Sequence, residues 1–361
     1  MFIRYDLTRI ISLYEKDQID RLYIDINGEK HFSKWKSASD LLIEIKSQRL
    51  SNGLSSSRSS WSFIDRTGSV PSIIQTHIDD EQLIPTGKPK SLDILDICLE
   101  RASELLNTGK HITVLWSGGV DSTLALFSLI RQASNLDQLS ILCTFESILE
   151  SGGMFDSVIK NSGIRIKFDT TRYSTDMPFS YDSEDLTQIY ITGQCADQLY
   201  GAPAFLKSSE SDDNIPWYNW YVRDTYDQNF LELIEPTIKY SERPIETVQD
   251  LRWWAMFNYG WTTVLYDDLI GRPAALASRI KSFYATPEFQ RWAIHTPTYY
   301  ENPITYDDPI RYKVPLKQAL GNLLDYPSYV VNKGKGVSVA WKKAENWYLL
   351  DRNFKTHYID H

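Results

Sequence analysis

Between about residues 90 and 200, short apolar runs alternate with segments in which apolar residues recur at helical spacing. The runs are rich in β-branched residues, which is typical of strands buried on both faces of a parallel sheet. The predicted strands are residues 112–116 (ITVLW), 139–145 (LSILCTF), 164–168 (IRIKF) and 189–192 (IYIT). Helices are predicted at residues 92–106 and at residues 155–160, and another helix is predicted to begin in the turn after Trp116. We therefore expect an α/β fold, a parallel sheet with helices on both faces.

The start of the chain is patterned differently from this middle part. Two short runs, residues 22–26 and 29–32, flank an Asn-Gly pair, and this combination predicts a β-hairpin. Further predicted elements of this region are an amphipathic helix at residues 38–49 and a polar loop at residues 51–60. Residues 85–90 (PTGKPK) then have the composition of a linker.

After about residue 215 the chain is rich in helical patterns and aromatic residues. Residues 248–265 (VQDLRWWAMFNYGWTTVL) are strongly apolar, which predicts a core helix or a pair of core helices. We expect two parts: a small N-terminal α+β region, residues 1–88, and a main α/β domain, residues 89–361, whose C-terminal part is helical.

The turn after the first predicted strand reads S-G-G-V-D-S, residues 117–122. Gly118 and Gly119 let the backbone approach an anion closely, and the helix that begins here offers unpaired N–H groups and the positive end of its dipole. Ser117 and Ser122 add hydroxyl donors. Asp121 can face a phosphate only if a cation such as Mg²⁺ lies between them. The pattern therefore predicts a phosphate site with a metal ion.

This motif is neither a Walker A loop nor the dinucleotide motif G-x-G-x-x-G. A buried strand followed by S-G-G-V-D-S resembles the pyrophosphate loop (PP-loop) of the N-type ATP pyrophosphatases, which include asparagine, β-lactam, GMP, NAD and tRNA lysidine synthetases. The resemblance implies an adenine nucleotide α-hydrolase-like fold, binding of ATP, adenylation of a substrate and release of pyrophosphate. Residues 117–122 would hold the pyrophosphate part of ATP. An ordinary strand–turn–helix is the alternative reading.

A second segment, residues 189–201, reads IYITGQCADQLYG. It resembles the segment G-E-G-A-D-E-L-F-G-G of asparagine synthetases. The matching positions are Gly193, Ala196, Asp197, Leu199 and Gly201. The resemblance implies that Asp197 and Asp121 together hold Mg²⁺ on the ATP phosphates, and we place Gly193 with the nucleotide-binding residues. Two carboxylates from neighbouring strand ends suit Mg²⁺; a helix N-cap is the other role open to Asp197.

The departures from this family pattern concern the acid–base chemistry. Gln194 and Gln198 stand where the family has glutamates, and Cys195 replaces a glycine. A glutamine cannot accept a proton, so Gln194 argues against plain asparagine synthesis and not against ATP chemistry. Gln194 stays a catalytic candidate by position. Cys195 is an alternative nucleophile, and Asp267 and Asp268 are alternative substrate ligands or bases.

A third segment, residues 313–341, reads KVPLKQALGNLLDYPSYVVNKGKGVSVAW. It resembles the family's K-x-P-L-R-x-A stretch and the basic K-x-G-F-x-V-P loop that follows it. The resemblance implies a catalytic lysine that contacts the phosphates, and both Lys333 and Lys335 fit the spacing to Gly336. A mobile, cation-bearing glycine loop suits stabilisation of phosphate charge, although a solvated basic loop would look the same. The resemblance covers roughly residues 90–345.

Residues 1–88 differ from the glutaminase domain that precedes the PP-loop in asparagine synthetases. The nucleophile of that domain is an N-terminal cysteine, whereas Phe2 follows Met1 here and the first cysteine is Cys98. The region is also too short for that domain. We expect a degenerate or replaced glutaminase position that caps the main domain, so a separate glutaminase or an amine-carrying partner is a candidate source of nitrogen.

The composition, 42% hydrophobic and 24% charged, is that of a soluble globular protein. No apolar stretch is long enough for a membrane span, and the start of the chain has no signal-peptide pattern. The cysteines Cys98, Cys143 and Cys195 are widely spaced without a C-x-x-C, which argues against a zinc site, a persulfide carrier or a disulfide scaffold. A cytoplasmic protein is expected. The net charge of −9 argues against a general nucleic-acid binder.

Together these patterns predict an ATP- and Mg²⁺-dependent, AMP-forming ligase. It would adenylate a small-molecule carboxylate, release pyrophosphate, and form an amide with ammonia or an amine. Three alternatives stay open: a PP-loop enzyme that adenylates a nucleobase carbonyl in nucleic acid or a nucleotide, a sulfurtransferase, which the missing C-x-x-C disfavours, and a non-catalytic nucleotide-binding remnant.

Overall fold

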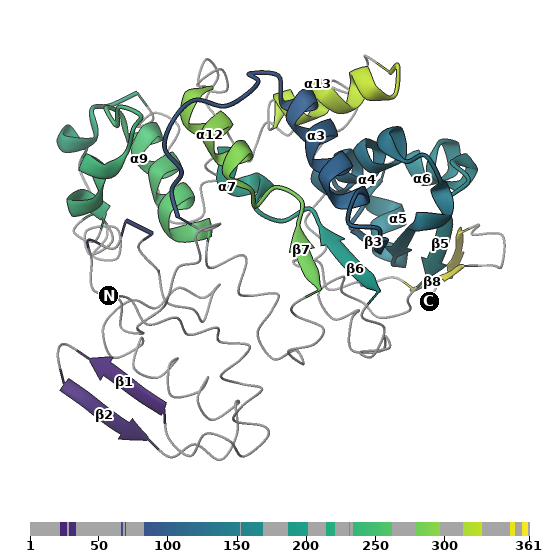
Figure 1. Ribbon diagram of the computed structural model, residues 1–361, viewed down its shortest axis with the longest axis horizontal. Helices are drawn as coiled ribbons and strands as arrows, with labels where there is room; N and C mark the ends of the chain where they lie inside the picture. The colour runs from purple at the N-terminus through teal and green to yellow at the C-terminus, as the bar shows by residue number, and fades with distance from the viewer. Residues whose placement is uncertain are drawn as a thin grey trace.

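A five-stranded sheet, parallel throughout, organises the described part of the molecule (Figure 1). The computed structural model describes residues 22–26, 29–33, 66–67, 69, 83–151, 153–168, 187–200, 214–220, 231, 234–261, 279–296, 313–326, 347–350 and 356–359. The predicted α/β class with a parallel sheet is confirmed.

The strand order of this sheet is β5-β4-β3-β6-β7. The strands are β3 (His111–Trp116), β4 (Leu139–Cys143), β5 (Arg165–Phe168), β6 (Gln188–Thr192) and β7 (Ile280–Ser282). The chain extends the sheet from β3 through β4 to β5, and then crosses to the other side of β3 to add β6 and β7. The order therefore reverses between β3 and β6. Ligands of open α/β sheets bind beside the strand ends at such a switch point.

The end of β4 differs from the prediction, which continued this strand to residue 145. Thr144 is the N-cap of α5 (Phe145–Glu150): its hydroxyl accepts from the backbone N–H of Ser147, and the Ser147 hydroxyl accepts from the N–H of Thr144. This capping box closes the strand at Cys143 because it uses the backbone groups that a longer strand would need. The helix predicted at residues 155–160 is instead the short α6 (Met154–Ser157) followed by a 3₁₀ turn.

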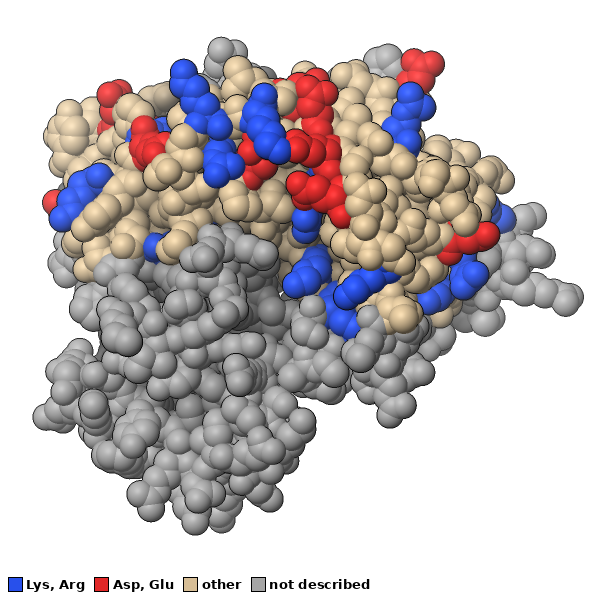
Figure 2. All heavy atoms as spheres, in the orientation of Figure 1, with Lys and Arg blue, Asp and Glu red and all other residues tan. Residues whose placement is uncertain are grey.

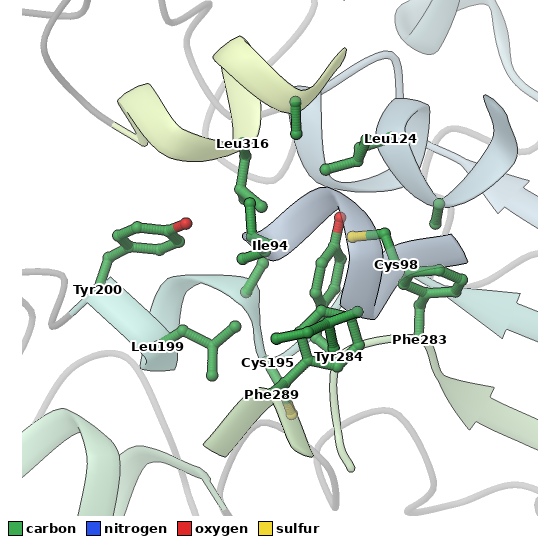
Figure 3. Close-up of a cluster of buried hydrophobic side chains, with 14 of the residues drawn as sticks. Ile94, Cys98, Leu124, Cys195, Leu199, Tyr200, Phe283, Tyr284, Phe289 and Leu316 are labelled. Atoms are coloured by element: carbon green, nitrogen blue, oxygen red, sulfur yellow. The ribbon is translucent and has the colours of Figure 1, made fainter. Parts of the chain in front are cut away.

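The main core lies between one face of the sheet and the helices. Alternate strand residues, among them Ile112, Val114 and Ile191, share one buried cluster with helix residues such as Cys98 and Leu124. The helices of this core are α3 (Ile94–Leu106), α4 (Val120–Gln132), α7 (Ala196–Tyr200), α12 (Pro287–His295) and α13 (Val314–Leu323). Figure 3 shows side chains of α3, α4, α7, α12, α13 and the segment after β7 meeting in this cluster.

The opposite face of the sheet carries a second, smaller buried cluster. Its members are Leu115, Leu142, Tyr190 and Ile280, and all four belong to strands. No described helix contributes to this second cluster, so helices on both faces stay a prediction.

The predicted core helix at residues 248–265 is confirmed over its described part. α9 (Val248–Ala255) begins with a capping box between Thr247 and Asp250, and it continues into a π-helix, Met256–Gly260. The residues of both are buried over Leu251–Gly260. Residues 262–265 lie outside the described part.

The segment predicted as a linker, residues 85–90, lies along α12. The side chain of Arg291 donates to the carbonyl oxygen of Thr86 at 2.9 Å, and Nε2 of His295 lies 2.9 Å from the carbonyl oxygen of Gly87. The segment is therefore attached to the main domain; the boundary between residues 88 and 89 stays a prediction.

Acidic and basic side chains are interspersed over the upper part of the face in Figure 2.

Arg66 connects an early residue to this same helical part. Its guanidinium donates to the carbonyl oxygens of Phe257 (2.7 Å) and Leu83 (3.2 Å) and to the side chain of Gln290. The backbone N–H of Arg66 donates to Oδ1 of Asn258 at 2.8 Å. Burial lowers the pKa of Arg66 to about 9.

Both ends of the chain carry a small antiparallel hairpin. β1 (Leu22–Ile26) pairs with β2 (Glu29–Ser33), as the Asn-Gly signal predicts. β8 (Trp347–Leu350) pairs with β9 (Thr356–Ile359), which the prediction of a helical C-terminal part did not include. The predicted helix 38–49 and loop 51–60 lie outside the described residues. Within the described residues, no helix has the length and apolarity that a membrane crossing requires.

Candidate functional site

The loop between β3 and α4 is held in a tight turn by its own side chains. The indole N–H of Trp116 donates to the hydroxyl of Thr123 at 2.9 Å, and that hydroxyl donates to the carbonyl oxygen of Gly119 at 2.7 Å. The Ser117 and Ser122 hydroxyls lie 3.0 Å apart, and the Ser117 N–H donates to Ser122 Oγ at 3.1 Å. No side chain caps α4. The N–H groups of this first turn face the position where a helix start would bind an anion.

Two glycines of the predicted site are required by close backbone approach. Gly118 has a φ of 77°, and a Cβ there would lie 2.0 Å from the carbonyl oxygen of Ser147. Gly193 directly follows β6, and a Cβ there would lie 2.7 Å from the backbone nitrogen of Ser122. The two sequence motifs thus meet backbone to backbone at the switch point, as their places after adjacent parallel strands require.

Asp121 and Asp197, the predicted metal ligands, come together through a third residue. Asp121 lies in the first turn of α4 and Asp197 in the first turn of α7. The Nζ atom of Lys313 contacts Oδ2 of Asp121 and lies 2.7 Å from Oδ1 of Asp197. The Lys313 side chain is only 3% exposed. One buried ammonium therefore bridges both carboxylates.

The electrostatics of this cluster favour a charged lysine. Burial acts to lower the pKa of Lys313, but the charges of Asp121 and Asp197 and their hydrogen bonds outweigh it, so the pKa is raised above its ordinary value.

Lys313 is the N-cap of α13 and adopts a left-handed backbone conformation, φ 55° and ψ 38°. The hydroxyl of Tyr284 donates to the carbonyl oxygen of Asp121 at 2.9 Å and so fixes the first turn of α4 from the other side.

Lys313 is the functional residue that sequence reasoning missed. It is the first residue of the K-V-P-L-K stretch, whose resemblance to K-x-P-L-R-x-A was visible, but no role was assigned to it. The contact with Asp121 spans 192 positions of sequence. A lysine directly before a proline-initiated helix was the available signal.

The turn that carries Gln194 and Cys195 is held by one local and one long-range hydrogen bond. The Ser282 hydroxyl donates to the carbonyl oxygen of Gln194 at 2.7 Å, and the Thr192 hydroxyl donates to Oε1 of Gln194 at 3.4 Å. Cys195 has a φ of 65°, a left-handed conformation that glycine adopts without strain. Its side chain is a buried thiol that forms no disulfide, and burial is a poor setting for a nucleophile.

The other predicted site residues lie outside the described part of the chain. They are Gly201, Asp267, Asp268, Lys333 and Lys335. Within the described residues, no group of three or more His, Cys, Asp and Glu side chains could hold a metal ion. Asp121 and Asp197 fit Mg²⁺ in chemistry, since they are hard oxygen donors already gathered around one cation. Mg²⁺ typically takes one or two carboxylates and completes its shell with phosphate oxygens and water.

Comparison with known proteins leaves the family open. A scan against protein-family models finds no match, and a search of curated proteins finds none either. The functional argument therefore depends on the motifs and on the geometry at the switch point.

Proposed function

We propose that this protein is an ATP-dependent, amide-forming ligase of the asparagine synthetase-like and β-lactam synthetase-like kind, within the N-type ATP pyrophosphatase (PP-loop) family. The observation that carries the proposal is the meeting of Asp121 and Asp197 around one cation, beside a Ser-Gly loop at the switch point of the sheet. The resemblance assigns both aspartates to one metal, and their carboxylates contact one and the same cation, Lys313 Nζ.

The nucleotide site would be divided between α4 and the cation position. The N–H groups at the start of α4, with the hydroxyls of Ser117 and Ser122, would bind the phosphates that leave as pyrophosphate. Asp121 and Asp197 would hold Mg²⁺, which neutralises phosphate charge when bound. Lys313 places a positive charge beside the same carboxylates and so favours the charge that develops on the leaving group.

The reaction proceeds in two steps. A carboxylate oxygen of the substrate attacks the α-phosphorus of ATP, the bond to the β-phosphate oxygen breaks, and pyrophosphate leaves with the electron pair. Ammonia or an amine then attacks the acyl carbon of the adenylate, loses a proton, and expels AMP. Gln194 lies near the carboxyl end of β6, where it can donate a hydrogen bond to a substrate but cannot take the amine proton. The proton acceptor is therefore another group.

The proposal is tested by ATP–pyrophosphate exchange with candidate small carboxylic acids. We expect Asp121→Asn to reduce exchange by about 100-fold or more, because the phosphate charge loses its metal ligand. Asp137→Asn, at an exposed position in the 3₁₀ turn Leu136–Gln138, is the matched control and should exchange like the wild type.

Two outcomes would contradict the proposal. Unchanged exchange in Asp121→Asn would show that the site is wrongly placed. Adenylation of a nucleic acid or nucleotide, with no carboxylic acid accepted, would show that the reaction is that of the enzymes that activate a nucleobase carbonyl.

A further inference from the structure

The cation position between Asp121 and Asp197 is already filled by the protein itself. Lys313 Nζ contacts one carboxylate and lies 2.7 Å from the other. Burying an ammonium is unfavourable unless acceptors replace its water, and here two carboxylates do so. The two carboxylates therefore stabilise the buried ammonium where it lies.

Backbone contacts anchor Lys313 at this position. Its carbonyl oxygen accepts from the N–H of Lys317 at 3.1 Å, so the residue is tied to the first turn of α13. α13 packs against α4, the helix that carries Asp121. Free Mg²⁺ entering here meets two carboxylates that already share one positive charge, and the described residues add no third acidic or histidine ligand. Like-charge repulsion and too few ligands both oppose its binding.

A nucleotide changes both conditions. Phosphate oxygens supply the metal ligands that the chain lacks, and they also give the Lys313 ammonium new acceptors, so it can leave the carboxylates without becoming unpaired. We propose that Lys313 is a positioning residue that occupies the metal position when ATP is absent and makes the binding of Mg²⁺ conditional on the binding of nucleotide. The inference rests on the proposed function, since it takes the Asp121–Asp197 pair to be the metal site.

The test measures Mn²⁺ binding by electron paramagnetic resonance, with and without α,β-methylene-ATP, which cannot be cleaved to pyrophosphate. In the wild type we expect weak binding of Mn²⁺ alone and binding at least about 10-fold tighter with the analogue. Lys313→Gln keeps a hydrogen-bond donor for the carboxylates but removes the charge. It should bind Mn²⁺ alone about 10-fold more tightly than the wild type, so most of the nucleotide dependence is lost.

Two further variants serve as references. Lys313→Arg keeps the positive charge and should keep the nucleotide dependence. Lys110→Gln removes an exposed lysine and should bind Mn²⁺ like the wild type. If Lys313→Gln does not fold, as judged by circular dichroism, Lys313→Met takes its place. The wild-type measurement alone also decides whether metal binding depends on the nucleotide.

The outcomes separate this inference from the proposed function. Equal Mn²⁺ affinity with and without the analogue in the wild type, or no gain of affinity in a folded Lys313→Gln, would overturn the inference while the ligase remains possible. Failure of Mn²⁺ to bind even with the analogue would remove the metal site on which both depend.

Discussion

At the residue scale, the central feature is a buried ammonium shared by two carboxylates. The cluster of Lys313, Asp121 and Asp197 keeps one net negative charge, because two carboxylates face one ammonium. The two carboxylates supply the acceptors that allow a lysine to stay charged at low exposure.

Buried thiols give the protein a pH dependence that can be worked out in sign. Burial raises the pKa of Cys143 from 9.0 to about 12 and that of Cys98 well above 9.0. The folded protein therefore keeps these protons at a pH where the unfolded chain has lost them. The stability that the protonated Cys143 contributes is fully present below pH 9 and is lost as pH rises from 9 to about 12, by roughly 1 kcal/mol per pH unit, and Cys98 acts in the same direction.

Urea unfolding between pH 8 and pH 11 measures this effect. Cys143→Ala should be less stable than the wild type at pH 8 but should lose stability less steeply above pH 9, because one titrating thiol is gone. Parallel pH profiles for the two proteins would contradict the assignment.

Sequence reasoning reached the acidic half of the site and not the basic half. The positions of Asp121 and Asp197 follow from local motifs after strands, and adjacent parallel strands necessarily bring such turns together. Lys313 belongs to a helix whose docking on α4 is a tertiary contact. The local pattern, a lysine directly before a proline-initiated helix, does not reveal which helix it will pack against. Lys333 and Lys335, the lysines predicted for this role, lie outside the described residues. Their catalytic role therefore stays a prediction.

At the element scale, two strand–turn–helix units build the site side by side. β3 leads into α4 and β6 leads into α7, and the two turns touch where Gly193 lies against the backbone of Ser122. The elements themselves were largely predictable, because buried parallel strands have a strong apolar signature. β7 (Ile280–Ser282) was missed because three residues with a lysine at the centre carry no such signature.

The contact between the two units predicts the effect of adding one methyl group. In Gly193→Ala the Cβ would lie 2.7 Å from the backbone nitrogen of Ser122, and a backbone atom cannot move aside cheaply. We expect a loss of stability of about 1–3 kcal/mol, measured by urea unfolding, and a loss of ATP–pyrophosphate exchange.

Gly109→Ala is the matched control for this variant. Gly109 has a φ of 69°, but no atom lies within 4 Å of its Cβ position. This variant should therefore show only the cost of a left-handed alanine, roughly 1 kcal/mol, with exchange preserved. Full exchange activity in Gly193→Ala would show that the two turns do not have to touch for function.

At the scale of the whole molecule, Arg66 ties an early residue to the late helical part. It lies 192 positions before Asn258 and 224 before Gln290, and it bonds to both. The predicted linker at residues 85–90 is likewise attached along α12. Composition alone suggested a free connection there, because proline, glycine and lysine do not reveal which helix will lie beside them.

Replacement of Arg66 should lower the free energy of unfolding of the whole protein. Arg66→Ala leaves the carbonyl oxygens of Phe257 and Leu83 without their guanidinium donor, which we expect to lower the free energy of unfolding by at least about 2 kcal/mol in urea unfolding. Arg66→Lys should recover only part of this, because an ammonium lacks the forked geometry. Arg131→Ala, at an exposed position of α4, should change stability by less than about 0.5 kcal/mol. Equal stability of Arg66→Ala and the wild type would contradict the anchoring role.

The sequence separation of Lys313 from Asp121 also matters during synthesis. The chain is made from its N-terminus, so a growing polypeptide can form β3, β4, β5 and β6 and bring both aspartates together well before residue 313 has left the ribosome. Until residue 313 is made, Asp121 and Asp197 have no Lys313 between them, and repulsion between the two carboxylates would oppose closure of the turns. A product truncated before α13 would lack the residue that bridges Asp121 and Asp197.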